Sequence, residues 1–206
     1  GYLLKIRDEV ARDGDSHIRS EAWRLDYERV PVGPREFFES PDFMGGLLDE
    51  LHPSWIGELE KVLDPSGEKT EWIVKGSVGS GKTTATTLAL LYKIYRLCCL
   101  KDPASFYELL PGSQMTFAFF NVTLDKAETG YESLRYWLES CPWFKRHAPV
   151  LARPADPIAI PSKRITTLIG SLLTHALGAH VFSFALDEAN FFKRAPGQVY
   201  RASDRT

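Results

Sequence analysis

The stretch from Val74 to Thr87 reads VKGSVGSGKTTATT and constrains the fold of this chain more than any other. Within it, Gly76, Gly81, Lys82 and Thr83 fit the spacing G-x-x-x-x-G-K-[ST], which is typical of a loop that wraps the phosphates of a nucleotide. Glycines let successive backbone N–H groups turn inward around an anion. The first turn of a following helix adds partial positive charge at the same place. The stretch therefore predicts a nucleoside triphosphate site.

Each polar residue of this phosphate loop has an expected role. Lys82 is predicted to reach the β- and γ-phosphates, and the Thr83 hydroxyl to bind Mg²⁺. Ser80 and Thr84 are further candidate donors. The predicted nucleotide-binding residues are Gly76, Ser77, Val78, Gly79, Ser80, Gly81, Lys82, Thr83 and Thr84, and the predicted cofactors are ATP and Mg²⁺.

The segments on either side of the loop place it between a strand and a helix. The run TEWIVKGS contains Trp72, Ile73 and Val74, which predict a short buried strand that delivers the loop. After Lys82, apolar residues recur at helical spacing with no proline before Pro103. This pattern predicts a helix of several turns that begins in the loop.

Strands and helices alternate further along the chain. QMTFAFFNV (114–122) predicts an apolar strand and TLDKAETGYESLRYWLES (123–140) a helix, and SKRITTLIGS (162–171) and HVFSFALDEA (180–189) predict two more strands. HPSWIGELEKVL (52–63) predicts a helix, and Pro34 a shorter one before Gly45 and Gly46. Such alternation is typical of a mostly parallel central sheet flanked by helices.

The run VFSFALDE ends in two acids, Asp187 and Glu188. A central apolar strand of this kind ends beside the phosphate loop, so Asp187 is expected opposite Thr83 as a magnesium ligand. Glu188 is predicted to orient or deprotonate an attacking water, which favours hydrolysis. The predicted fold class is α/β, a P-loop NTPase of the RecA-like group with an additional catalytic glutamate. Lys82 and Glu188 are its predicted catalytic residues.

Composition narrows the remaining choices. A chain of 206 residues suits one domain, and a net charge of −2 gives no whole-chain basic field for nucleic acid. Lys93 and Arg96 interrupt the longest apolar stretch, so no membrane span is predicted. Three cysteines without metal-ligand spacing predict small buried thiols in a reducing compartment.

Residues 1–65 are interpreted as an N-terminal helical segment on the adenine side, with Trp55 as candidate adenine contact, and 66–206 as the ATPase core.

A basic segment, FKRHAPVLARPADPIAIPSKR (144–164), allows two interpretations. It is either a solvated loop, or it supplies a patch that contacts a nucleic-acid backbone or an arginine that acts on a neighbouring subunit. Arg146, Arg153 and Arg164 are the candidate arginines of the second interpretation.

The phrases FFESPDF, GSVGSGKTT, FAFFNVTLDKAETGY, CPWF, IGSLLTHALG and FALDEANFF, in this order, resemble the ATPase domain of the large terminase subunit of tailed bacteriophages. The resemblance extends from about Phe37 to Phe192 and implies a motor that hydrolyses ATP to drive double-stranded DNA through a portal into a procapsid. It further implies that the subunits form a homo-oligomeric ring on the portal and are monomeric in isolation. A small terminase subunit would be a partner, and the protein would act in the host cell cytoplasm.

The chain departs from this family's pattern at several points. Many large terminases have an arginine inside the phosphate loop, where this chain has Ser77–Ser80. Many also have an arginine immediately before the glycine upstream of the second motif, where this chain has Leu177. The chain ends at Thr206 without a nuclease constellation of acids, so we expect a fragment without nuclease activity. Two alternatives remain open, a RecA-like helicase ATPase and a nucleotide-switched binding module.

Overall fold

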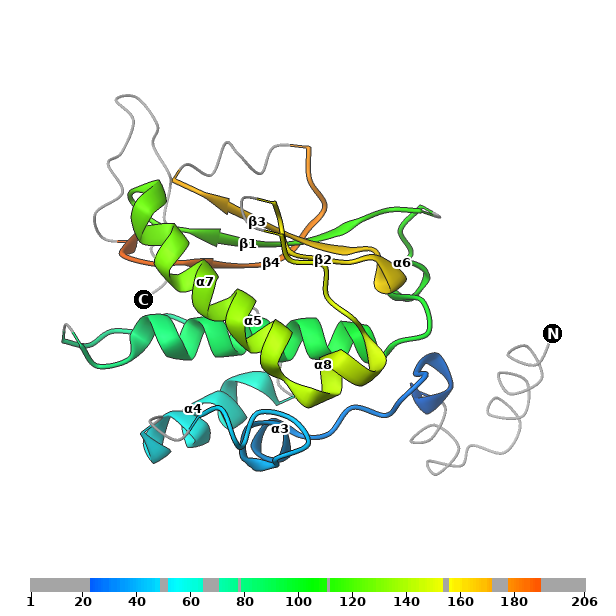
Figure 1. Cartoon of the computed structure of the whole chain (residues 1–206), viewed down its shortest axis with the longest axis horizontal. Helices are drawn as coiled ribbons and strands as arrows, with labels where there is room; N and C mark the ends of the chain where they lie inside the picture. The colour runs from blue at the N-terminus through cyan, green and yellow to red at the C-terminus, as the bar shows by residue number, and fades with distance from the viewer. Residues whose placement is uncertain are drawn as a thin grey trace, which may run out of the picture.

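The computed structural model describes residues 23–48, 52–64, 71–77, 79–110, 112–153, 156–171 and 178–189. Its helices are α3 (Pro34–Glu39), α4 (Pro53–Leu63), α5 (Lys82–Cys99), α6 (Pro103–Phe106), α7 (Leu124–Ser140) and α8 (Pro142–His147), with 3₁₀ turns η1 (Trp23–Asp26) and η2 (Pro161–Lys163). Its strands are β1 (Met115–Phe120), β2 (Ala159–Ile160), β3 (Ile165–Gly170) and β4 (Val181–Leu186). The predicted α/β class with a mostly parallel sheet flanked by helices is confirmed (Figure 1).

The four strands form one sheet in the order β2-β3-β1-β4. β1 pairs in parallel with β3 and with β4, whereas β2 is antiparallel to β3. Phe120 is in register with Gly170 on one side and with Leu186 on the other. The carboxyl ends of the three parallel strands therefore lie at one edge of the sheet, where ligands of open α/β sheets bind. The three strands predicted downstream of the loop are confirmed.

The strand predicted at Trp72–Val74 is wrong, because residues 71–77 have no regular secondary structure. The Ile73 side chain is 68% exposed, while Trp72 packs partly against the core and edge-on against Trp55, with ring centroids 6.3 Å apart. A strand needs a neighbour that pairs its backbone groups. Among the described strands, β4 lies at the end of the sheet and pairs with β1 alone, so residues 71–77 do not pair with it. A short apolar run without a pairing neighbour does not form a strand.

Helices α5 and α7 cover one face of the sheet, α4 packs on α5, and α3 packs on α4 (Figure 1). The buried face of α5 contacts both the strands and the N-terminal helices. Phe37 of α3 lies against Tyr95 of α5 at 4.5 Å between ring centroids, and Tyr95 against Trp143 of α8 at 4.7 Å. The described residues of the N-terminal segment thus share one hydrophobic core with α5, and the boundary at residue 65 stays a prediction.

The helix starts follow the chemistry of their first residues. Pro34 opens α3 as predicted, but α3 ends at Glu39 and turns fill residues 41–47, so the glycines do not end it. Thr123 accepts a bond from the Lys126 N–H at 3.4 Å and caps α7. The segment over residues 1–65 is interpreted from the sequence as helical, but its described residues 23–30 form only η1 and the isolated bridge of Tyr27 with Leu100.

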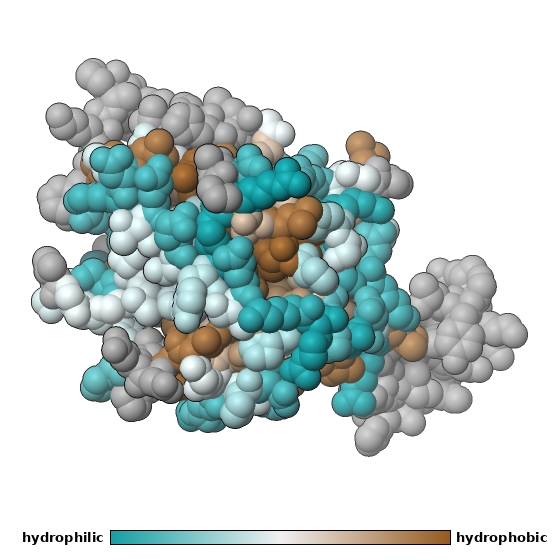
Figure 2. Space-filling model, viewed as in Figure 1, coloured by the Kyte–Doolittle hydropathy of each residue, from teal (hydrophilic) through white to brown (hydrophobic). Residues whose placement is uncertain are grey.

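The three cysteines are buried and free, as predicted. Burial raises the pKa of Cys98 well above its usual value and that of Cys99 to about 12, so both stay protonated at neutral pH. In the part of the chain that the structure describes, no helix combines the length and apolarity that a membrane crossing needs. Figure 2 shows one face of the molecule, on which polar side chains surround separate apolar patches.

We predict that Gly130→Ala destabilises the fold. Gly130 of α7 faces Phe119 of β1, and a Cβ there would overlap the ring Cζ atom. Phe119 is 1% exposed, so its ring can shift only by displacing other core side chains. Overpacking of this kind costs roughly 1–3 kcal/mol. Urea unfolding followed by circular dichroism measures the change.

Gly57→Ala in α4 is the matched control, since no atom lies within 4 Å of the added Cβ. Alanine is favoured over glycine inside a helix by about 0.5–1 kcal/mol, so this variant should gain stability. A Gly130→Ala variant that gains as much stability as Gly57→Ala would refute the close approach of α7 to β1.

Candidate functional site

The phosphate loop leads directly into α5. Gly79 and Gly81 have φ angles of +78° and +81°, a region that side-chain-bearing residues rarely adopt, and Gly81 is the N-cap of α5. The Ser80 hydroxyl donates to the Ser77 carbonyl at 2.9 Å and closes the turn between them. The predicted loop residue Val78 lies outside the described part of the chain, as does Leu177, the position at which many large terminases have an arginine.

Lys82 lies across the loop that precedes it. Its ammonium donates to the carbonyl oxygens of Gly76 at 3.0 Å and of Ser77 at 2.5 Å. Bonds from an ammonium to a phosphate oxygen are stronger than bonds to a neutral carbonyl. A nucleotide phosphate can therefore take over the ammonium from the loop's own carbonyls.

Trp55 of α4 supports the loop from outside. Its indole N–H donates to the Ser80 carbonyl at 3.0 Å. A Cβ on Gly81 would lie 3.0 Å from the same indole nitrogen, so the ring packs against the loop backbone. This contact fixes the loop on α4, while the adenine role of Trp55 stays a prediction.

The second motif meets the loop at the carboxyl edge of the sheet. The Asp187 N–H donates to the Phe120 carbonyl at 2.9 Å, which extends the pairing of β4 with β1 by one residue. The Thr83 hydroxyl donates to the Asp187 carboxylate at 2.7 Å, although the two residues are 104 positions apart. The structure thus brings together the two residues predicted to hold magnesium.

This pair suits Mg²⁺ in its chemistry. Hydroxyl and carboxylate oxygens are ligands for hard cations, and Mg²⁺ commonly takes only one or two protein ligands together with phosphates and waters. Among the described residues no group of three or more His, Cys, Asp or Glu could hold a metal by itself. Thr83 and Asp187 would therefore need a nucleotide phosphate to complete the site.

Glu188 follows Asp187 with a φ of +52°, uncommon for a residue other than glycine. Its N–H donates to the Asp187 carboxylate at 2.9 Å, and its own carboxylate accepts from the Lys126 ammonium at 2.7 Å. Lys126 was not among the residues predicted from the sequence. The signal was its place in the first turn of the helix after β1, because parallel strands bring that turn to the edge where β4 ends.

The three candidate arginines lie elsewhere. Arg146 pairs with Asp42 at 3.0 Å, and Arg164 lies 3.9 Å from the Asp102 carboxylate, just before β3 and thus at the amino edge of the sheet. Arg153 is exposed. None of the three arginines is brought to the phosphate loop of its own chain. The predicted loop residue Thr84, in contrast, lies in the first turn of α5, directly after the loop.

The basic segment also contains Lys163, which is neither solvated nor available to a ligand. Its side chain is 7% exposed and donates to Glu28 at 2.8 Å and to the Leu100 carbonyl at 2.6 Å. The hydrogen bond from Lys163 lowers the pKa of Glu28. Lys163 thus joins the N-terminal segment to the end of α5.

Comparison with known proteins agrees with this geometry. The model of one family, described as the N-terminal P-loop domain of the uncharacterized protein MJ0330, matches residues 51–179. The matched range contains α4, the phosphate loop and the strands β1 to β3, and it ends before β4. No curated protein and no solved structure matches the sequence. Because the match covers more than half of the chain, the chain belongs to this family of P-loop domains.

Proposed function

We propose that the domain hydrolyses ATP with Mg²⁺ at the junction of the phosphate loop and the carboxyl edge of β4. The observation that carries this proposal is the 2.7 Å bond between the Thr83 hydroxyl and the Asp187 carboxylate. It places a hydroxyl, a carboxylate and the N-terminus of an 18-residue helix at one point. A triphosphate with its metal requires these three features together.

Each residue of the site has its own role in hydrolysis. Lys82 exchanges its loop carbonyls for the β- and γ-phosphates and stabilises the charge that develops there. Thr83 and Asp187 hold the metal, which neutralises phosphate charge when bound. Glu188 orients the attacking water in line with the γ-phosphate and accepts its proton. Lys126 acts as a positioning residue, because it holds one carboxylate oxygen of Glu188, while the other accepts no hydrogen bond from the residues that the structure describes.

A more specific proposal follows from the sequence phrases. Their order resembles the large terminase subunit, so we infer that the domain is a motor that moves double-stranded DNA into a procapsid. Its partners would then be the portal, a small terminase subunit and further copies of itself in a ring. An arginine from a neighbouring copy would complete the site, with Arg146, Arg153 and Arg164 as the candidates. Such arginines contribute about 10³ to 10⁵ in rate.

Steady-state ATP hydrolysis by the Glu188→Gln variant tests the chemical proposal. The amide keeps an oxygen that accepts the Lys126 bond but is no base, so kcat should fall about 10²- to 10⁴-fold. Nucleotide affinity, measured by titration calorimetry with ATP and Mg²⁺, should stay within about threefold. Glu132→Gln on the exposed face of α7 is the matched control and should leave kcat unchanged. Unchanged turnover in Glu188→Gln would contradict the role of Glu188.

Lys126→Met tests the positioning role. Its bond to Glu188 is a partly exposed ion pair worth roughly 1 kcal/mol or less, so we expect kcat to fall about three- to fivefold with little change in KM. Lys126→Arg should restore most of the loss, since guanidinium also binds a carboxylate. A methionine variant as active as the unaltered protein would remove Lys126 from the mechanism.

The motor proposal is tested by adding procapsids that carry the portal, together with duplex DNA, to the unaltered protein. ATP turnover per subunit should rise with protein concentration and rise again on assembly, because the trans arginine arrives only in the ring. Strand displacement from a forked duplex would instead favour the helicase alternative. Tight product retention with negligible turnover, unaffected by DNA or procapsids, would favour the nucleotide-switched binding module.

A further inference from the structure

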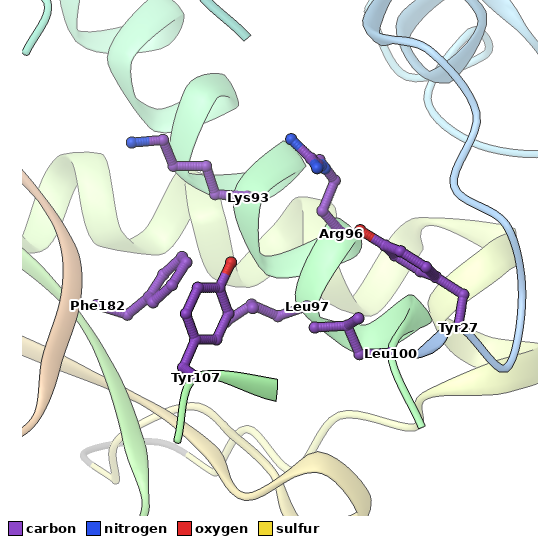
Figure 3. Close-up of a pocket in the computed structure, with 7 residues that line it drawn as sticks. All are labelled: Tyr27, Lys93, Arg96, Leu97, Leu100, Tyr107 and Phe182. Carbon is purple, nitrogen blue, oxygen red and sulfur yellow. The ribbon is translucent and has the colours of Figure 1, made fainter. Parts of the chain in front are cut away.

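A cavity of about 320 Å³ lies at the far end of α5 from the phosphate loop. Its lining residues, drawn in Figure 3, are Tyr27, Lys93, Arg96, Leu97, Leu100, Tyr107 and Phe182. This volume falls at the lower end of the range for small-molecule pockets. On an α-helix the step from Thr83 to Arg96 spans about 20 Å, so the cavity is separate from the candidate nucleotide site.

Two cations lie at the rim of the cavity. Lys93 and Arg96 are neighbours on one face of α5, and their charged ends extend to the same side (Figure 3). No lining residue is acidic, and within the described ranges neither cation forms a salt bridge. Lys93 donates to the Ser183 hydroxyl at 3.0 Å, and burial lowers its pKa. The cavity therefore has a positive charge that nothing in its lining compensates.

Arg96 contributes a second and independent indication. Its Nε atom is buried and has no hydrogen-bond partner among the described residues. A buried N–H donor without an acceptor is costly, and such donors in folded proteins are usually bonded to protein, water or a ligand. A guanidinium that still lacks a partner is suited to a planar anion such as a carboxylate.

The wall below these cations is apolar and aromatic. Tyr107 packs edge-on against Phe182 of β4, with ring centroids 5.0 Å apart, and Leu97 and Leu100 continue the wall along α5. The Tyr107 hydroxyl points to the side on which the two cations end (Figure 3). The cavity thus offers rings and aliphatic side chains to one part of a ligand and hydrogen-bond donors to another.

We propose that this cavity binds a small aromatic carboxylate, with its acid group on Arg96 and Lys93 and its ring against Phe182 and Tyr107. The volume limits the body of the ligand to about one or two rings. The binding is independent of the proposed ATPase function, since no residue of the phosphate loop lines the cavity.

Titration with 2-naphthoate, followed by ¹H–¹⁵N NMR of the full chain, tests the proposal. A probe of this size should bind with a Kd of about 1 mM. Shift changes should centre on the amides of Leu97, Leu100 and Phe182. The uncharged probe 2-naphthamide has nearly the same shape and should bind at least about tenfold more weakly. Equal affinity for the two probes would overturn the proposal.

Variants then test which side chain binds the carboxylate of 2-naphthoate. Arg96→Gln should weaken 2-naphthoate at least about fivefold, because a charge-assisted bond is replaced by a neutral one. Lys145→Gln on the exposed side of α8 is the matched control and should bind as the unaltered protein does, as should Lys82→Ala. Loss of binding in Lys82→Ala, or shifts centred on Gly81 and Thr83, would mean that the probe binds the phosphate loop and would refute the cavity.

If Arg96→Gln does not fold, as judged by its NMR spectrum, the comparison of naphthoate with naphthamide on the unaltered protein decides the question alone. A matching affinity of Arg96→Gln and the unaltered protein, in a folded variant, would likewise refute the proposed anion contact.

Discussion

The packing of α5 between the sheet and the N-terminal helices is the constraint on which the rest of the structure depends. Most of this helix is buried, and its residues Tyr92 and Tyr95 exchange hydrogen bonds with the backbone of Val32 at 2.8 and 2.9 Å. Dense packing on all sides fixes both the axial position and the rotation of a helix. The phosphate loop is attached to the first residue of α5, so its place is fixed by a hydrophobic core.

The direction of α5 relative to β4 determines how the site is assembled. Thr83 contacts Asp187 after the end of β4, whereas Lys93 contacts Ser183 nearer its start, so the helix and the strand run in opposite directions. The N-terminus of the helix, with its partial positive charge, therefore meets the acids at the strand's carboxyl end. The same arrangement places the opposite end of α5 beside Phe182, where the cavity with Lys93 and Arg96 lies.

Sequence patterns predicted those parts of the structure in which the local signal and the tertiary contacts agree. The apolar runs of β1, β3 and β4 are bounded by polar residues and form strands with parallel partners. The loop spacing and the pair Asp187–Glu188 predicted that two segments far apart in the chain lie together. The Thr83 hydroxyl bonds the Asp187 carboxylate, while the roles of these residues in binding stay predictions. Residues 72–74 carried the same apolar signal as the other strands, but strand formation also depends on a neighbouring backbone, which a local pattern does not contain.

The lysines of this chain show why the remaining parts could not be predicted. Four lysines of identical chemistry bond different partners through their ammonium groups. Lys82 bonds a loop carbonyl and Lys93 a serine hydroxyl. Lys126 bonds a candidate catalytic carboxylate and Lys163 a buried backbone oxygen. Only Lys82 has its partner within the same motif, so only its role follows from spacing. The other three have partners fixed by the register of the sheet and the rotation of α5 and α7, since a side chain bonds whatever the packing of its element brings within reach. A lysine outside a motif therefore gains its function from the fold.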